Sequence, residues 1–457
     1  MKKAVILCAG AGTKIWPYAE IRCKAMINVS NKPIVAYSVD ALTELGFEQI
    51  VIVGNRFVEE IRAYFKNYKN VEIVIDNAPK GTAFSLLAAS ESIGENDFLA
   101  LYGDTIVDKN DLDKLIKTFK QTKENTALVG KLVGHSSDVI GCDLSADGSI
   151  HKVWGHSRDE STHIFGGFAF KANMFDNLKN NSCRFTATEV GMMPPIEGYI
   201  EMTVSDYIDE GGTVKTAVAQ SKVLDIDKPW HILEASHYIN GKRCNELKSN
   251  ELDEGASIDE SATINGFVKL GKNSKIGKNV IIEGNIIVGD NTDVSNAAII
   301  EGNVVIGDNS SVKNACFVSY ASTIGNDCVI SHAAELDGII FNRVFLYHYM
   351  EYYGIIGENT DLGAATVCGS LRFDDGHTIQ RIKGRRELPN SGYGDAVFLG
   401  DYCRTGVNAI LMPGVKVGVY SVVGAGVLLN KDLKNNTLLY TEQNQIEKTW
   451  GFEKYGW

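Results

Sequence analysis

The sequence predicts two fold classes in one chain: an α/β domain with a mostly parallel, doubly wound sheet, followed by an all-β parallel β-helix. Two observations lead to this prediction. Over residues 1–230, short apolar strands alternate with helical stretches at the spacing of βαβ units. From residue 256 onward, aliphatic residues recur at every sixth position, a period typical of β-helices in which each hexad forms one face of a coil.

The α/β part begins with the apolar run 4–7, which lacks polar alternation and therefore suits a strand covered on both faces. The other expected strands are 50–53, 71–75, 98–101 and 127–129, and the expected helices are 34–45, 58–67, 83–93 and 111–121. Pro229 suits the first turn of a further helix, expected through 231–240 and on toward Leu252. The predicted boundaries are 1–230 for the α/β domain, 231–255 for a linker helix, 256–433 for the β-helix and 434–457 for a tail.

Fourteen aliphatic residues keep the six-residue period without a gap. They are Ile258, Ile264, Leu270, Ile276, Ile282, Val288, Val294, Ile300, Ile306, Val312, Val318, Ile324, Ile330 and Leu336. The period resumes at Ile356 and Leu362 and closes with Leu399, Leu411, Val417, Val423 and Leu429. Small and Asn-type residues are expected at the corners of the coils, where φ is positive.

Two stretches interrupt this period. Residues 341–354 are aromatic-rich and out of register, which predicts a break in the β-helix. Residues 369–395 are expected to form a protruding loop that carries Arg372, Arg381, Lys383, Arg385 and Arg386. Such a basic loop either holds phosphates or is simply solvated. The aromatic tail is expected to pack on the β-helix or on a neighbouring subunit.

Composition narrows the function classes. A net charge of −12 argues against a nucleic-acid partner, because phosphate backbones are held by basic surfaces. Nine scattered cysteines without a C-x-x-C pair favour a reduced, cytoplasmic protein over a disulfide framework or a zinc site. No stretch is long enough to span a membrane, so no membrane partner is expected.

The loop after the first strand contains Gly10, Gly12 and Thr13 and ends in Lys14. Glycines allow backbone N–H groups to close around an anion, so this loop predicts a phosphate site, with a tight βα connection as the alternative. Lys24 follows ten residues after Lys14, and the two cations are expected to converge on one phosphate chain.

Two aspartates are candidates for a metal site near this loop. Asp104 ends an expected strand and Asp225 precedes the linker helix, and carboxylates placed in this way suit Mg²⁺. Asp108 or Asp111 fits the role of a helix N-cap better than Asp104 does. For Asp227, a structural N-cap and a functional role remain equally open.

These features resemble the sugar-1-phosphate nucleotidyltransferases that carry a left-handed β-helix. The resemblance covers nearly the whole chain and is greatest to bifunctional N-acetylglucosamine-1-phosphate uridyltransferase/glucosamine-1-phosphate acetyltransferases of the archaeal type. The motifs that carry it are Leu7-Cys8-Ala9-Gly10-Ala11-Gly12-Thr13-Lys14 with Cys23-Lys24, the loop from Asp76 to Gly81-Thr82-Ala83, Gly103-Asp104, and the closing run 225–235. The resemblance implies a Rossmann-like nucleotidyltransferase domain and a homotrimer formed through the β-helix.

The resemblance also implies roles for single residues in the attack of a sugar phosphate on an NTP. Asp104 and Asp225 would hold Mg²⁺, Lys14 would neutralise the leaving pyrophosphate, and Lys24 would hold phosphate near the reacting centre. Leu7, Ala9, Gly10, Gly12, Thr13, Asp76, Gly81, Thr82 and Gly103 would contact the nucleotide, and Gly141 and Gly167 would contact the acceptor.

Several positions depart from the family pattern. Lys14 replaces an Arg and keeps its charge without the bidentate fork, and Cys23 replaces a Pro. Asp76 replaces a Gln, and an ionised Asp only accepts hydrogen bonds, which favours cytosine or guanine over uracil. The runs 152–156 and 165–167 lack the polar groups that contact the sugar in the family, so an unusual acceptor is expected.

The β-helix part raises the alternative of acyl transfer from acetyl-CoA. The position of the family's catalytic His falls on Tyr347, with His348 next to it, and Arg372 and Arg404 lie in family motifs that are retained. The leading hypothesis is an Mg²⁺-dependent nucleotidyltransferase acting on a phosphorylated small molecule. The alternatives are an added acetyltransferase activity and a non-catalytic subunit that binds sugar nucleotides.

Overall fold

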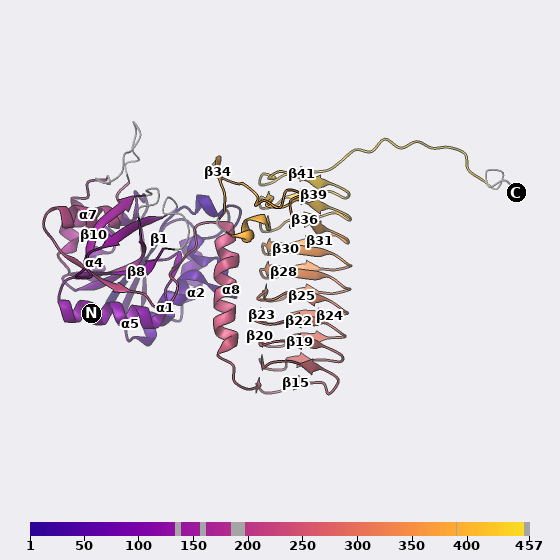
Figure 1. The fold of residues 1–457 in the computed structure, drawn as a ribbon, viewed down its shortest axis with the longest axis horizontal. Coiled ribbons are helices and arrows are strands. Elements are labelled where there is room, and N and C mark those ends of the chain that lie inside the picture. The colour runs from indigo at the N-terminus through magenta and orange to yellow at the C-terminus, as the bar shows by residue number, and fades with distance from the viewer. Residues whose placement is uncertain (133–138, 156–160, 184–196, 390, 452–457) are drawn as a thin grey trace.

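A computed structural model describes residues 1–132, 139–155, 161–183, 197–389 and 391–451. Figure 1 shows an α/β domain, a long helix (α8) and a stacked β-helix, with α8 lying between the other two and running along the β-helix. Among the described residues, no helix combines the length and the apolar character needed to span a bilayer.

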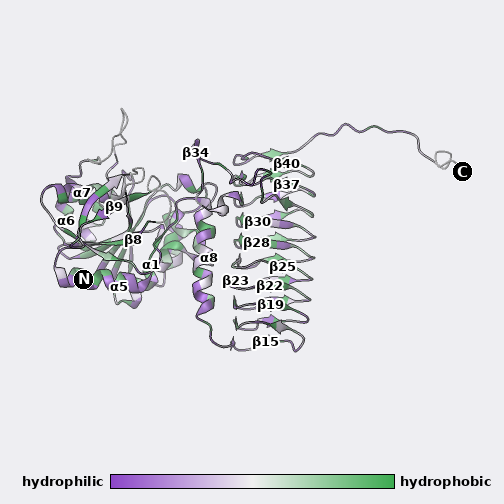
Figure 2. Ribbon diagram, viewed as in Figure 1, coloured by the Kyte–Doolittle hydropathy of each residue, from purple (hydrophilic) through white to green (hydrophobic). Residues whose placement is uncertain are grey.

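The sheet of the α/β domain has the order β10-β9-β11-β6-β1-β4-β5, and β8 pairs with β11 and β12. Its strands are β1 (Lys3–Cys8), β4 (Gln49–Gly54), β5 (Val71–Ile75), β6 (Phe98–Tyr102), β8 (Asn125–Lys131), β9 (Ile140–Leu144), β10 (Ile150–Gly155), β11 (His163–Phe170) and β12 (Val214–Val218). Strands β6, β1, β4 and β5 are parallel, as predicted, whereas β11 is antiparallel to β6, β8 and β9. Hydrophobic residues line these strands in Figure 2, because both faces of the sheet are covered.

The described helices are α1 (Ile34–Glu44), α2 (Val58–Phe65), α3 (Thr82–Leu87), α4 (Ser90–Ile93), α5 (Lys109–Thr122), α6 (Met174–Lys179), α7 (Ile200–Asp209) and α8 (Pro229–Asn245). The prediction of one helix over 83–93 is wrong, because the Ala89 N–H bonds to the Leu86 carbonyl and tightens the chain between α3 and α4. Asp108 caps α5, as predicted, by accepting from the Asn110 N–H. Helix α8 stops short of Leu252, which already belongs to a β-helix strand, β14 (Glu251–Leu252).

The β-helix follows the predicted hexads. One of its faces is a ten-stranded parallel sheet: β15 (Ser257–Ile258), β18 (Lys275–Ile276), β21 (Asp293–Ser295), β24 (Ser311–Lys313), β27 (Val329–Ile330), β29 (Phe345–Leu346), β31 (Asp361–Leu362), β36 (Arg404–Thr405), β39 (Val422–Val423) and β41 (Leu438–Leu439). Aligned residues such as Ile258, Ile276 and Val294 are 18 positions apart, which is three hexads per coil. Asn residues with positive φ occupy corners and form ladders, as between Asn273 and Asn291.

The other two faces merge into one sixteen-stranded sheet. Its strands are β14, β16 (Thr263–Ile264), β17 (Val268–Leu270), β19 (Ile281–Glu283), β20 (Ile286–Val288), β22 (Ile299–Glu301), β23 (Val304–Ile306), β25 (Phe317–Val318), β26 (Thr323–Ile324), β28 (Glu335–Ile340), β30 (Glu351–Ile356), β32 (Val367–Cys368), β35 (Val397–Leu399), β37 (Ile410–Leu411), β38 (Lys416–Val417) and β40 (Leu428–Leu429). They merge because β28 is continuous and pairs with both β25 and β26.

The predicted break at 341–354 is wrong. This stretch stays in the stack as β29 and the start of β30, and Leu336 aligns with Tyr352 at a spacing of 16 residues instead of 18. Two residues are missing at one corner, so β28 and β30 run straight through it. Tyr352 is buried at an aliphatic position, where its hydroxyl bonds to the Ile355 and Val397 carbonyls.

Residues 369–395 protrude from the β-helix, as predicted. The chain leaves at this same corner and returns at β35. The loop contains a hairpin, β33 (Gln380–Ile382) with β34 (Arg385–Glu387), and its predicted basic residues are exposed. The loop is nevertheless anchored: buried Gln380 donates to the Gly394 and Gly414 carbonyls. The tail was predicted to begin at residue 434 and to pack on the β-helix or on a neighbouring subunit. Leu438 and Leu439 still belong to the β-helix as β41, whereas residues 440–451 are exposed and run away from it (Figure 1).

The chain between Lys14 and Lys24 docks directly on the β-helix. The Tyr18 hydroxyl donates to the Ile355 carbonyl at 3.0 Å, and the Tyr18 ring meets Phe341 edge-on. Arg22 is buried and places its guanidinium 2.6 Å from Asp401 and 3.6 Å from Glu358. Burial alone would lower the pKa of Arg22, but Asp401 and Glu358 raise it above its usual value, so the guanidinium stays charged.

Arg22→Met should destabilise the protein by about 3–5 kcal/mol, because it leaves the Asp401 carboxylate buried without its partner. Denaturant unfolding measures this change. The matched control is Lys269→Met, which breaks an exposed pair with Glu251 and should cost at most about 1 kcal/mol. Equal losses from the two substitutions would contradict the structural role of Arg22.

Candidate functional site

The glycine loop follows β1 at the carboxyl end of the parallel half-sheet. Gly10 is exposed, and a Cβ added there would meet no atom within 4 Å. Gly12 has φ +64°, and an added Cβ would lie 2.8 Å from the Ala19 Cβ. The turn at Gly12 therefore needs glycine for its conformation, whereas Gly10 leaves open backbone that a ligand can approach. Leu7, Ala9 and Thr13 lie in or beside this loop.

Lys14 and Lys24 converge on one carboxylate. The Lys14 ammonium lies 2.9 Å from Asp227 Oδ2, and the Lys24 ammonium lies 3.1 Å from Asp227 Oδ1 and 2.7 Å from Asp104. Asp227 does not cap α8, because the N-cap position is Lys228 and no side chain caps this helix. The N-cap alternative for Asp227 is therefore wrong. The sequence did not predict that Asp227 contacts both lysines.

Asp104 and Asp225 lie at the same end of a two-stranded antiparallel ribbon of β7 (Thr105–Ile106) and β13 (Leu224–Asp225). Asp225 pairs with Thr105, and the Ile226 N–H donates to the Asp104 carbonyl at 3.0 Å. The ribbon thus fixes the two aspartates beside each other although 121 positions separate them in the sequence.

The electrostatics of this pair suit a divalent cation. The pKa of Asp225 is raised to about 7, mainly by burial and secondly by the negative charges of Asp104 and Asp227. Negative charge therefore exceeds positive charge around this carboxyl. No cluster of three or more metal-ligating side chains occurs among the described residues. Two carboxylates are nonetheless sufficient for Mg²⁺, which commonly takes its remaining ligands from water and substrate phosphates.

The expected base loop is held by local hydrogen bonds. Asp76 accepts from the Ser85 hydroxyl at 2.7 Å and from the Ala78 N–H at 3.1 Å. Gly81 has φ +99°, and an added Cβ would lie 2.3 Å from the Gly198 carbonyl oxygen. Thr82 begins α3 and accepts from the Ile200 N–H. Gly103, before Asp104, is packed so closely on β1 that an added Cβ would meet Cys8 Sγ at 2.4 Å.

The two glycines expected at the acceptor have roles in packing. An added Cβ at Gly141 would lie 2.6 Å from Ser161, and one at Gly167 would lie 2.5 Å from Leu101. Gly167 also has φ +146° at a register shift of β11. Of the altered run 152–156, Trp154 donates to Asp143 at 2.7 Å, and His156 lies outside the described residues.

The candidate acyl-transfer residues are separate from one another. His348 is exposed at a corner of the β-helix and stacks on His332, with the two Nδ1 atoms 3.2 Å apart. Arg372 forms a bidentate ion pair with Asp374 in the protruding loop, and Arg404 is exposed on β36. Within the described part of the chain, no hydrogen bond or ion pair joins His348 to either arginine.

The protruding loop also reaches the α/β domain, which the sequence did not predict. Glu387 on β34 forms an ion pair with Lys228, and Ile382 packs in the shared core of the two domains. Glu387 and Ser391 line a cavity of about 210 Å³ together with Asp225 and His231. The β-helix therefore supplies part of the surroundings of a candidate metal ligand.

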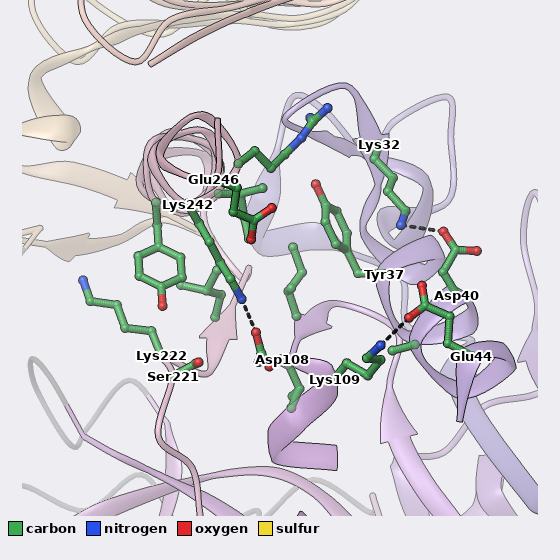
Figure 3. A pocket seen from close by; sticks show the side chains of 17 residues that line it. Lys32, Tyr37, Asp40, Glu44, Asp108, Lys109, Ser221, Lys222, Lys242 and Glu246 are labelled. Carbon is green, nitrogen blue, oxygen red and sulfur yellow. Dashed lines mark hydrogen bonds and ion pairs between the residues drawn. The ribbon is translucent and has the colours of Figure 1, made fainter. Parts of the chain in front are cut away.

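A second cavity, of about 250 Å³, is lined by residues of α1, of the β7–β13 ribbon and of α8 (Figure 3). Three of its lysines are each paired with a carboxylate: Lys32 with Asp40, Lys109 with Glu44 and Lys242 with Asp108. These pairs neutralise the cations that would otherwise attract a phosphate, and we assign this cavity no ligand.

Known proteins resemble this chain over part or nearly all of its length. Residues 3–138 match the family described as nucleotidyl transferase. The chain is 32% identical over 450 residues to the bifunctional protein GlmU of Methanococcus maripaludis, covering 97% of this chain and 98% of that protein. The chain belongs to the GlmU family. It is a nucleotidyltransferase, and the alternative of a non-catalytic subunit is set aside.

Other GlmU-family relatives also match at nearly full length. A bifunctional sugar-1-phosphate nucleotidylyltransferase/acetyltransferase of Sulfurisphaera tokodaii is 25% identical and covers 94% of this chain and 98% of its own. Among solved structures, a UDP-glucose pyrophosphorylase from Acinetobacter baumanii covers 53% of this chain and 94% of its own, at 20% identity and a TM-score of 0.44. This last similarity is too low to support an argument about the present chain.

Gly81→Ala should destabilise the protein by about 1–3 kcal/mol, because φ is positive and the new Cβ would overlap the Gly198 carbonyl. Gly10→Ala is the matched control and should stay within about 0.5 kcal/mol of the original protein, since the space around Gly10 is open. Denaturant unfolding compares the two variants. A stable Gly81→Ala protein would show that the strained turn is not required.

Proposed function

We propose that this enzyme transfers a nucleotidyl group from an NTP to a sugar 1-phosphate or a related phosphorylated small molecule and releases pyrophosphate. The observation that carries the proposal is the convergence of Lys14, Lys24, Asp104 and Asp225 at the carboxyl end of the parallel half-sheet, beside an open glycine loop. The name of the relative from Sulfurisphaera tokodaii, a sugar-1-phosphate nucleotidylyltransferase/acetyltransferase, supports a sugar phosphate as the acceptor.

The reaction needs positioning and charge neutralisation more than covalent chemistry. A phosphate oxygen of the acceptor forms a bond to the α-phosphorus of the NTP, and the bond from that phosphorus to the oxygen bridging to the β-phosphate breaks. The electron pair leaves with pyrophosphate. In-line geometry requires that the attacking phosphate oxygen of the acceptor and the leaving pyrophosphate lie on opposite sides of the α-phosphorus.

The residues of the site suit these tasks. Asp104 and Asp225 would hold Mg²⁺, which would supply positive charge to the substrate phosphates. Lys14 is 40% exposed and is therefore placed to meet the leaving pyrophosphate, whereas Lys24 is 10% exposed and lies deeper, beside Asp104. The open backbone at Gly10 would donate N–H groups to phosphate oxygens.

We also propose that Asp76 contributes to base selection. Its two carboxylate oxygens each accept one hydrogen bond from the chain, and each retains a further lone pair. The ionised carboxylate can accept from the amino group of cytosine or guanine but cannot donate to O4 of uracil. CTP or GTP should therefore be preferred to UTP.

A pyrophosphate-release screen that crosses UTP, dTTP, CTP and GTP with phosphorylated acceptors tests this function. Asp104→Asn should lower turnover at least about 100-fold in the productive pair, because one carboxylate of the metal site is lost. Asp108→Asn is the matched control, since Asp108 caps α5 and pairs with Lys242 away from the site. No release with any pair would refute the function, and a clear preference for UTP would refute the role of Asp76.

Acetyl transfer in the β-helix is a second candidate function. The contact between His332 and His348 favours it, because a neutral imidazole in such a pair can accept a proton from an attacking amine. In that step the amine nitrogen forms a bond to the acetyl carbon of acetyl-CoA, the C–S bond breaks, and the thiolate takes up a proton to give free CoA.

Release of free CoA in the presence of amino-sugar phosphates measures this second activity. His348→Ala should reduce it at least about 100-fold, since general-base catalysis contributes about 10²–10⁴. His151→Ala, an exposed histidine on β10, is the control and should leave the rate unchanged. Absence of CoA release with every acceptor would limit the β-helix to a structural role.

We further propose a homotrimer located in the cytoplasm. Exposed apolar side chains on the β-helix support the oligomer: Ile299, Ile410, Leu428 and the stacked pair Tyr402 and Tyr420. All nine cysteines are unbridged and eight of them are buried, which suits a reducing compartment.

A further inference from the structure

Asp227 holds the two lysines of the phosphate site together. Each of its carboxylate oxygens takes one ammonium: Oδ2 lies 2.9 Å from Lys14, and Oδ1 lies 3.1 Å from Lys24. A phosphate group bridges two lysines in the same manner, with one oxygen for each. The carboxylate thus occupies, in this structure, the position between the cations where a substrate phosphate is expected.

No structural role of the Asp227 side chain accounts for this contact. The carboxylate does not cap α8, and Asp227 uses its backbone N–H, not its side chain, to bond His231 Nδ1. Burial and the nearby Lys228 lower the pKa of His231 to about 3, so the imidazole is neutral and accepts this bond. The side chain of Asp227 therefore acts only on the two lysines.

The charges around the lysines leave no positive surplus. Asp104, Asp225 and Asp227 contribute three carboxyls against the two ammoniums of Lys14 and Lys24. The next lysine, Lys228, is paired with Glu387. An NTP would bring about four further negative charges to this group.

We propose that Asp227 is an internal substitute for a substrate phosphate, and that its charge makes NTP binding depend on a divalent cation. The proposal rests on the proposed function. An NTP that binds without metal must displace Asp227 from the two lysines. The Asp227 carboxylate is then unpaired and lies next to the phosphates of the NTP. An NTP that arrives with Mg²⁺ restores the charge balance, so the lysines can exchange Asp227 for phosphate.

Isothermal titration calorimetry with CTP and with UTP, in EDTA and in excess Mg²⁺, tests this proposal. Asp227→Asn is isosteric and should tighten metal-free binding at least about tenfold, because one negative charge within a few ångströms of the phosphates is removed. Affinity in Mg²⁺ should change much less, so the ratio of the two Kd values falls. Asp227→Glu keeps the charge and should keep the metal dependence.

Two further variants show whether the effect is local. Asp176→Asn removes the same charge from an exposed position on α6 and should leave both Kd values unchanged. Lys14→Met in the Asp227→Asn background should abolish the gain, since the released ammonium is what binds the metal-free nucleotide. Thermal melting confirms that each variant is folded.

An unchanged ratio of Kd values in Asp227→Asn would overturn the proposal. So would weaker binding both with and without Mg²⁺, since Asp227 would then bind the metal or the nucleotide directly. The binding measurement needs no acceptor, so it is independent of the pyrophosphate screen. An active enzyme with an unchanged ratio refutes only the role of Asp227, and an enzyme inactive with every substrate pair refutes the proposed function.

Discussion

The contact of Arg22 with Asp401 connects the candidate site to the β-helix. Lys14 and Lys24 bracket a short segment of the chain, and this segment is bound to the β-helix by Arg22 and Tyr18 and, through Trp16, by a hydrogen bond to Asn435. A buried guanidinium is stable only with its carboxylate in place. The positions of the two lysines therefore depend on coils of the β-helix that lie more than 300 residues away in the sequence.

The protruding loop adds a second connection between the domains. Through Glu387 it neutralises Lys228, and it closes one side of the cavity that contains Asp225. Lys228 begins the turn into α8, directly after the two aspartates. The candidate nucleotidyl-transfer site belongs to the α/β domain, and the β-helix fixes both the segment between the two lysines and the segment after the two aspartates.

Local patterns in the sequence were sufficient to predict both folds and most elements. The hexads predict coils because aliphatic residues at a fixed period all face the interior of the stack. The glycine loop is predicted because a Cβ at Gly12 would collide with Ala19 and Gly10 leaves the backbone open. The sequence pattern predicted a break where the structure has coils of 16 residues. Two residues fewer per coil change the phase of the hexads but leave the strands stacked. Tyr352 obscured the pattern further, since it fills a position that is otherwise aliphatic.

The candidate site could be predicted only in part. Lys14 and Asp104 follow from the ends of β1 and β6, which converge in a parallel sheet. Lys24 and Asp225 were predicted from their spacing to Lys14 and to the linker helix. The bridge through Asp227 depends on side-chain directions over a separation of 213 residues, and no local pattern encodes it. The same holds for Arg22, whose partner lies on the β-helix. A lone Arg between two apolar residues gives no sign that it is buried.

The shortened corner of the β-helix has a consequence for where the α/β domain docks. A stack of equal coils offers the same surface at every turn, so a partner could bind at many heights along it. At β28 and β30 the missing residues remove the corner, and Ile339, Phe341 and Ile355 join the apolar core shared with Tyr18 and Trp230. The two shortened coils thus make one part of an otherwise repetitive surface different from the rest, and the α/β domain docks at that part.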